Sequence, residues 1–341
     1  MRIKSIVMKK IAVLFAAAVA MTTGALHAAA DTDPDFNVKT SVPPKILFIG
    51  DSITAGYGLD GFSEDKNTDC ASFANILSKV FSSELPPEAD FHMKNMGISG
   101  LTSNALKNKL KDGYYDSELR EADAVVISIG GNDLLWVLLH IVDSENSFSE
   151  VIKQLVSMES QMDENLDKFS DNLTEITDEI FDRNQSGDFQ LFFQTLYNPF
   201  ENYSISALDE LAQDKIGRLN EIIYEHSEGG NLYTVADVAA DFKGECAELT
   251  NIDYLDIHPN ADGHARIAKL LQPVIESKTY TYYDREAEMQ YAIDAENERQ
   301  ESERRKKMTA AGCAAASGAA VVGAVVFGAV KSIKSKKAKK E

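Results

Sequence analysis

The sequence is short of cysteine, of basic charge and of internal repetition. Its 341 residues include three cysteines, and none lies in a Cys-x-x-Cys pair or at a Cys/His spacing typical of zinc. Lys and Arg number 34 against 54 Asp and Glu, which gives a formal net charge of -20. We find no internal repeat. These lacks argue against a zinc module and against non-specific binding of nucleic acid.

The charge is unevenly distributed along the chain. Residues 1–30 carry a net charge of +4 and residues 304–341 carry +9, so the residues between them carry −33. An acidic body of this kind favours solubility, and charge alone says nothing about its fold.

The first thirty residues have the pattern of a secretory signal peptide. A basic start, from Arg2 to Lys10, precedes the apolar run Ile11–Met21, and Ala28-Ala29-Ala30 offers a small-residue cleavage site. The sequence therefore predicts an exported protein, followed by a polar linker over residues 31–43.

The C-terminal part of the sequence changes character twice. Asp284–Lys307 is highly charged, Met308–Val330 is apolar and uncharged, and lysines follow from Lys331 to Lys340. The apolar run is long enough to cross a bilayer. Together with a signal peptide, this pattern predicts an extracytoplasmic domain anchored in the cell membrane through a C-terminal transmembrane helix, with a cytoplasmic tail.

Between these ends, apolar strand patterns alternate with helical ones, which predicts a doubly wound α/β sheet with parallel strands. The predicted strands are Lys45–Ile49, Asp90–Asn95, Ala124–Ile129, Gln190–Leu196 and Leu232–Val235. The predicted helices are Ser72–Phe81, Leu101–Leu110, two or more over residues 134–183, Ser206–His226 and Ala261–Gln272, the last ended or kinked at Pro273.

These patterns divide the chain into consecutive parts. They are a signal peptide (1–30), a linker (31–43), a catalytic domain (44–277), a charged helical stalk (278–307), a transmembrane helix (308–330) and a basic tail (331–341).

The first strand ends at Gly50-Asp51-Ser52, which is the most informative stretch of the sequence. A small polar residue after a buried parallel strand lies where open α/β sheets bind their ligands. Ser52 is also placed to enter a following helix, whose free backbone N–H groups favour negative charge. Two interpretations follow, a nucleophile beside an anion-stabilising nest or a serine that only caps a helix.

Three further stretches, at Gly97, Asn132 and His258, lie at strand ends or in the last loop. Acyl transfer is the chemistry that they support together. A nucleophilic Ser52 needs a base, and a neutral imidazole such as His258 is the usual one. An oxyanion needs donors, which the backbone N–H groups of Ser52 and Gly97 and the side-chain amide of Asn132 offer.

These four stretches resemble the motif blocks of the SGNH (GDSL-type) hydrolase family. The blocks are Gly50-Asp51-Ser52-Ile53-Thr54, Asn95-Met96-Gly97, Gly130-Gly131-Asn132-Asp133 and His258-Pro259-Asn260. The resemblance implies a flavodoxin-like three-layer α/β/α sandwich and an esterase, lipase or related acylhydrolase that needs no metal or cofactor. It assigns Ser52 as nucleophile, His258 as base, and Ser52, Gly97 and Asn132 as oxyanion-hole donors.

The sequence departs from this family at one position. The family has an aspartate three residues before the histidine, where this sequence has Leu255, while Asp256 and Asp253 lie nearby. Asp256 is our predicted third catalytic residue; Asp253 or a backbone carbonyl are the alternatives, because the task is to hold one tautomer of His258.

Other interpretations stay open at this point. Asp256, His258, Asp262 and His264 form a rival set of metal ligands, and Cys70 and Cys246 form either one disulfide or two free thiols. The ester substrate is a small molecule, a lipid or an acylated glycan, the last making the protein a deacetylase. A surface binding module on the same fold, without efficient turnover, is the alternative to an enzyme.

Overall fold

A computed structural model describes residues 34–65, 69–134, 148–187, 189–201, 206–252 and 256–337, with side chains described outside residues 148–157 and 313–337. The chain divides into two units, residues 1–36 and 37–341. The account below concerns the second. The predicted signal peptide over residues 1–30 lies outside the described residues.

A five-stranded parallel sheet forms the centre of the domain, with strand order β3-β2-β4-β5-β6. The strands are β2 (Lys45–Gly50), β3 (His92–Asn95), β4 (Ala124–Ser128), β5 (Gln190–Gln194) and β6 (Thr234–Ala236). The order reverses between β2 and β4, so the crevice at their carboxyl ends is the expected ligand site of a doubly wound sheet. The predicted mixed α/β fold with a parallel sheet is confirmed.

The inner strands are apolar without alternation because helices cover both faces of the sheet. Residues Ile46–Ile49, Ala124–Ile127 and Leu191–Phe193 are all at most 3% exposed. A strand buried on both faces needs apolar side chains on both, which is why these runs were recognisable in the sequence.

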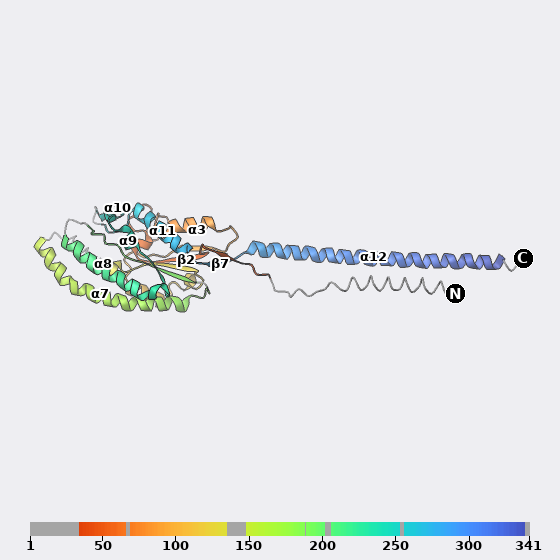
Figure 1. Ribbon diagram of the computed structural model, residues 1–341, viewed down its shortest axis with the longest axis horizontal. Helices are drawn as coiled ribbons and strands as arrows, with labels where there is room; N and C mark the ends of the chain where they lie inside the picture. The colour runs from red at the N-terminus through yellow and green to blue at the C-terminus, as the bar shows by residue number, and fades with distance from the viewer. Residues whose placement is uncertain are drawn as a thin grey trace. The chain divides into compact units, whose positions relative to one another are not determined.

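The helices form a layer on each side of the sheet (Figure 1). One layer contains α3 (Phe73–Glu84), α9 (Val238–Phe242), α10 (Cys246–Leu249) and α11 (Ala261–Glu276), and the other contains α4 (Ser103–Lys111), α7 (Phe148–Arg183) and α8 (Ser206–His226). Shorter elements are α2 (Ser52–Ala55), α5 (Asp116–Leu119) and the 3-10 turn η1 (Glu228–Gly230).

One helical prediction differs from the structure. Helix α11 continues through Pro273 to Glu276, because Leu271 and Ile275 are both buried and hold the last turn against the core. Over residues 134–183, where two or more helices were predicted, the structure describes helix α7 from residue 148, and residues 135–147 lie outside the described residues. Apolar residues at three- and four-residue steps, from Met162 to Ile180, keep one face of α7 buried along this length.

A separate two-stranded sheet brings together the first and the last strand of the chain's described part. Strands β1 (Asn37–Thr40) and β7 (Tyr280–Tyr283) pair antiparallel, with Asn37 opposite Tyr283 and Thr40 opposite Tyr280. The interpretation of residues 31–43 as an irregular linker is therefore wrong for β1. Residues of β1 and β7 line a cavity together with Lys45, at the amino end of β2, so this pair lies at the opposite end of β2 from Ser52.

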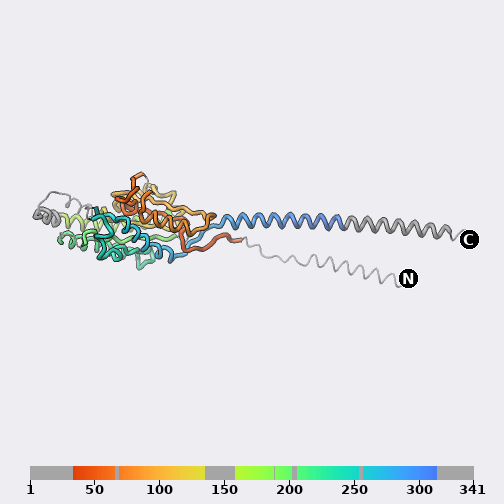
Figure 2. The backbone as a smooth tube through the Cα atoms, turned by 90° about the horizontal axis from the view of Figure 1, so that it is seen from above, coloured from red at the N-terminus to blue at the C-terminus, as the bar shows by residue number. Residues whose placement is uncertain are grey.

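Helix α12 (Arg285–Lys337) follows β7 directly. Residues 285–312, blue in the tube of Figure 2, form an uninterrupted helix that is exposed on all sides. The charged stalk predicted over residues 278–307 is helical from Arg285, whereas Tyr280–Tyr283 within it form strand β7. In the described part of the chain, we find no helix with the length and apolarity that a membrane span requires, so the transmembrane helix predicted over residues 308–330 is not supported.

Candidate active site

Ser52 is placed by a close contact between β2 and β4. Gly50, at the end of β2, has φ +136°, and a Cβ atom there would lie 2.0 Å from the carbonyl oxygen of Ser128. Asp51 then caps α2 by accepting a hydrogen bond from the N–H of Ile53 at 3.1 Å. Ser52 is the first residue of α2, so its N–H makes no bond within the helix.

The imidazole of His258 reaches Ser52 from the far end of the chain. Ser52 Oγ and His258 Nε2 lie 2.8 Å apart, although the two residues are separated by 206 positions. On the other side of the ring, His258 Nδ1 is hydrogen-bonded to Asp256 Oδ1. The expected meeting of residues 52 and 258 within hydrogen-bond distance is therefore seen.

Asp256 reaches a histidine only two residues away through a tight turn. Its Oδ1 accepts the backbone N–H of His258 at 3.1 Å as well as contacting the ring, which is the geometry of an Asx turn. The segment is fastened by the N–H of Asn251, which donates to the carbonyl of His258 at 3.0 Å. Of the three groups considered for orienting His258, the structure shows Asp256, while Asp253 lies outside the described residues.

The surroundings of Asp256 favour its charged form. Partial burial raises the pKa of Asp256, but the hydrogen bond and charge of His258, with a further hydrogen bond from Asn251, outweigh burial and leave the pKa below its ordinary value. The carboxylate is therefore suited to hold a proton on Nδ1 of His258 and to stabilise the imidazolium.

Tyr57 is a site residue that the sequence reasoning missed. Its ring lies over that of His258 with centroids 4.7 Å apart, and it also contacts Phe62 at 5.5 Å. The adjacent Gly58 has φ +83°, and a Cβ atom there would lie 3.1 Å from Asp256 Oδ2. The turn after α2 thus covers the His258–Asp256 pair. In the sequence, the glycines around Tyr57 indicated a turn but not this contact.

Beneath Ser52, Asp51 belongs to a buried polar network. Ser128 Oγ donates to Asp51 Oδ1 at 2.8 Å and is itself 2.8 Å from Thr54 Oγ1. Burial raises the pKa of Asp51 to about 6, although the hydrogen bonds from Ser128 and Ile53 oppose the change. Ser128 is a second residue that no motif in the sequence indicated.

Gly97, one of the predicted oxyanion donors, is packed against α2. A Cβ atom at Gly97 would lie 2.4 Å from the backbone nitrogen of Ala55, so a larger residue would displace the helix. The N–H of Gly97 donates to Asn95 Oδ1 at 3.0 Å. An oxyanion would have to share this N–H with Asn95, as three-centre hydrogen bonds allow.

Asn132, the predicted side-chain donor, lies after β4 in the helical turn at residues 131–134. Its Nδ2 donates to the carbonyl of Leu101 at 3.0 Å, which leaves a second amide hydrogen for another acceptor. The preceding residue, Gly131, lies against Asp51: a Cβ atom there would be 3.5 Å from Asp51 Oδ2. The loop after β4 therefore lies beside the residue that precedes Ser52.

His264 does not join His258 in a metal site. It is fully buried in α11, where its Nδ1 accepts the N–H of Phe73 at 3.2 Å. Burial, with a smaller contribution from the charge of His258, lowers the pKa of His264 to about 3, so this ring is neutral. Within the described residues, no group of three or more His, Cys, Asp or Glu side chains is arranged to hold a metal ion.

Cys70 and Cys246 are two separate buried thiols, so the disulfide alternative is wrong. Each is held locally: Cys70 Sγ donates to the carbonyl of Ala55 and Cys246 Sγ to that of Phe242, both at 3.5 Å.

The fold and the order of the residue blocks define an ester hydrolase of the lipase and acylhydrolase type. Residues 48–266 match the GDSL-like Lipase/Acylhydrolase family, and the chain belongs to that family.

Two curated proteins and one solved structure illustrate the similarity. The uncharacterized protein YpmR of Bacillus subtilis (strain 168) is 24% identical over 242 residues, which cover 70% of this chain and 84% of YpmR. The spore germination lipase LipC of Bacillus licheniformis is 25% identical over 224 residues, covering 66% and 92%. The lipase Lip_vut3 from a goat rumen metagenome superposes with a TM-score of 0.52 at 22% identity, covering 67% of this chain and 96% of that structure, which shows a shared fold.

Proposed function

We propose that this protein is a serine esterase that cleaves carboxylic esters through an acyl-enzyme on Ser52. The observation that carries the proposal is the unbroken chain of hydrogen bonds from Ser52 Oγ through His258 to Asp256 at the carboxyl edge of the sheet. A serine hydroxyl becomes a competent nucleophile when a neutral imidazole accepts its proton, and a carboxylate on the other nitrogen fixes the tautomer that can do so.

The reaction proceeds in two halves. Ser52 Oγ attacks the ester carbonyl while His258 Nε2 takes the hydroxyl proton, and the resulting oxyanion accepts hydrogen bonds from the N–H groups of Ser52 and Gly97 and from Asn132 Nδ2. The carbon–oxygen bond to the alcohol then breaks as His258 returns the proton to the departing oxygen. In the second half, a water molecule loses a proton to His258, attacks the acyl-enzyme, and releases the acid and Ser52.

An extracytoplasmic location is part of the proposal. It is supported by residues 1–30, in which a basic start is followed by an apolar run and then by small residues at a possible cleavage site. Fractionation of cells that produce the full chain tests it, with the protein expected outside the cytoplasm and a cytoplasmic protein contradicting it.

A fluorophosphonate probe tests the assignment of the nucleophile, because it reacts covalently with an activated serine. We expect labelling of the full-length protein, loss of labelling in Ser52→Ala, and normal labelling in Ser83→Ala, where the serine is exposed on α3. Labelling that persists in Ser52→Ala would contradict the assignment.

A binding module with little turnover is the second candidate. It is favoured by the hydrogen bond from the N–H of Gly97 to Asn95 Oδ1, since this donor is already engaged. Short p-nitrophenyl esters discriminate between the two. Hydrolysis that depends on both Ser52 and His258 eliminates the binding module, and absence of such hydrolysis eliminates the esterase.

A further inference from the structure

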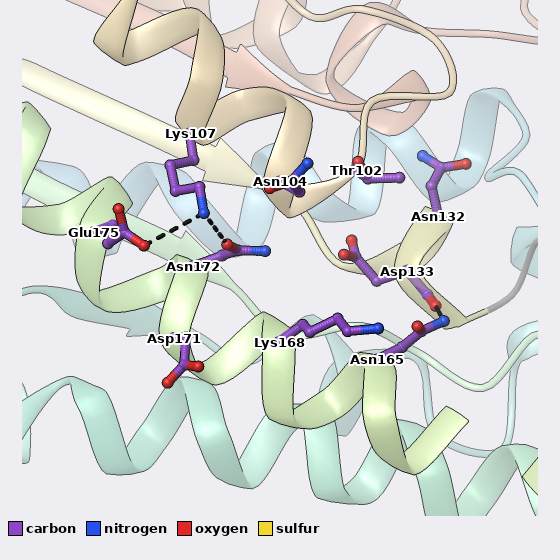
Figure 3. Close-up of a pocket in the computed structure, with 10 residues that line it drawn as sticks. All are labelled: Thr102, Asn104, Lys107, Asn132, Asp133, Asn165, Lys168, Asp171, Asn172 and Glu175. Carbon is purple, nitrogen blue, oxygen red and sulfur yellow. Dashed lines mark hydrogen bonds and ion pairs between the residues drawn. The ribbon is translucent and has the colours of Figure 1, made fainter. Parts of the chain in front are cut away.

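A polar cleft of about 440 Å³ opens between α4 and α7, beside the helical turn at residues 131–134 that carries Asn132 (Figure 3). One wall comes from the start of α4, with Asn104 and Lys107, and the other from α7, with Lys168 and Asp171. Asn132 itself lines the cleft. The cleft therefore includes one of the proposed oxyanion donors, while Ser52 is not among its lining residues.

Hydrogen bonds connect both walls of the cleft to Asp133, the residue after Asn132. The half-buried carboxylate of Asp133 accepts hydrogen bonds from the N–H of Ser103 at 2.9 Å and from its Oγ at 2.6 Å, which fixes the first turn of α4. From the other wall, Asn165 Nδ2 donates to the carbonyl of Asp133 at 2.8 Å. Both walls are thus tied to the residue that follows Asn132, so their position relative to that amide is set by the fold.

The chemistry of the lining selects against an acyl chain. All ten side chains that line the cleft are polar, and four of them are asparagine. An asparagine amide presents both a donor and an acceptor, as does a hydroxyl group, so repeated amides suit a ligand with several hydroxyls. A hydrocarbon chain in this cleft would desolvate these groups without replacing their hydrogen bonds.

The charges of the lining also select against a strongly anionic ligand. The two lysines are outnumbered by the carboxylates of Asp133, Asp171 and Glu175. Lys107 Nζ is already bound to Asn172 Oδ1 at 2.7 Å and to Glu175 Oε1 at 3.3 Å, as the dashed lines in Figure 3 show. A phosphate would be repelled by this excess of negative charge, whereas a neutral polyol carries no charge and would not be repelled.

We infer that this cleft binds the alcohol part of the ester and that this alcohol is a neutral saccharide. The inference rests on the proposed function, since it places the ester carbonyl at Ser52 and the sugar ring beyond Asn132. The protein is then a deacylase of acylated carbohydrate, in which the sugar is recognised between α4 and α7.

The test compares an acetylated xylo-oligosaccharide with p-nitrophenyl acetate, whose alcohol has no hydroxyls for the cleft. Asn104→Ala and Asp171→Ala change exposed residues on opposite walls, and Asn108→Ala, one turn further along α4 and outside the lining, is the matched control. We expect the kcat/KM ratio of saccharide ester to p-nitrophenyl acetate to fall through a higher KM in both wall variants. The fall should be about 2- to 10-fold in Asn104→Ala, which loses a neutral hydrogen bond, and at least about 10-fold in Asp171→Ala, which loses one to a charged group. The ratio should stay unchanged in Asn108→Ala.

An unchanged ratio in both wall variants, or faster hydrolysis of a short-chain phosphatidylcholine than of the saccharide ester, would overturn the inference. Calorimetric binding of the acetylated oligosaccharide to the full-length Ser52→Ala protein separates this failure from that of the proposed function. Binding that weakens in Asn104→Ala supports the sugar site even without turnover. No binding, together with hydrolysis of p-nitrophenyl acetate by the unmodified protein, leaves the esterase and removes the sugar site.

Discussion

Replacing Asp51 by asparagine should abolish a specific pH dependence of stability. Asp51 is 2% exposed, its carboxylate contacts Ser128 and the start of α2, and the charge of Asp133 also acts on it. Asparagine has nearly the same shape and can still accept the N–H of Ile53, but it carries no charge. The substitution therefore removes mainly the free energy of burying an ionised group.

The size and sign of the effect follow from the pKa of Asp51. It rises from the ordinary value of 3.8 to about 6 in the folded protein, mainly through burial. Between these two values the native state keeps a proton that the unfolded chain has lost, so stability falls as pH rises. One pKa unit corresponds to about 1.4 kcal/mol, so the loss is about 3 kcal/mol, complete above pH 6 and absent below pH 3.8.

Urea denaturation followed by circular dichroism, from pH 4 to pH 8, measures this loss. The free energy of unfolding of Asp51→Asn minus that of the unmodified protein should grow by about 2 kcal/mol between pH 4 and pH 6.5, because part of the loss has already occurred at pH 4, and then stay nearly level. Asp60→Asn, which changes an exposed carboxylate, should show no such growth. A difference for Asp51→Asn that is constant with pH would refute the reasoning, because burial of charge would not be the dominant effect.

Three further predictions concern the site and its support. Asp256→Asn should lower kcat for p-nitrophenyl acetate about 10²- to 10⁴-fold with little change in melting temperature, since it leaves the wrong tautomer of His258; a fall under 5-fold would exclude this role. Gly50→Ala should destabilise the protein by at least about 3 kcal/mol in urea, because its Cβ would overlap the carbonyl of Ser128, whereas Gly187→Ala, which meets open space, should have little effect. Incubation with EDTA should leave ester hydrolysis unchanged, and loss that added zinc or magnesium restores would favour metal chemistry.

The sequence predicted those parts of the fold that depend on local pattern. Runs such as Ile46–Ile49 and Ala124–Ile127 are apolar on both faces, and glycine follows at positions 50 and 130, so both the strands and their carboxyl ends were recognisable. Because parallel strands bring their carboxyl ends to one edge, the approach of Ser52 and the loop after β4 followed from the same reasoning.

The parts that the sequence did not predict depend on contacts between distant segments. The pairing of β1 with β7 joins residues about 240 positions apart, and nothing in Asn37–Thr40 alone distinguishes a strand from a linker. The contact between the rings of Tyr57 and His258 likewise joins residues that are distant in the sequence. The approach of Asp256 to His258 is local, but it depends on a side chain turning back on its own backbone, which residue spacing does not encode.

The pairing of β1 with β7 also decides how the domain would respond to mechanical tension. Asn37 and Tyr283 are opposite one another, so the chain leaves both strands at the same end of the ladder. Tension applied to the two departing segments would separate the paired residues one after another, from Asn37 and Tyr283 toward Thr40 and Tyr280. Force would reach the five-stranded sheet only after the last residue pair of β1 and β7 had separated. Ser52 and His258 would therefore keep their alignment until the small sheet had opened.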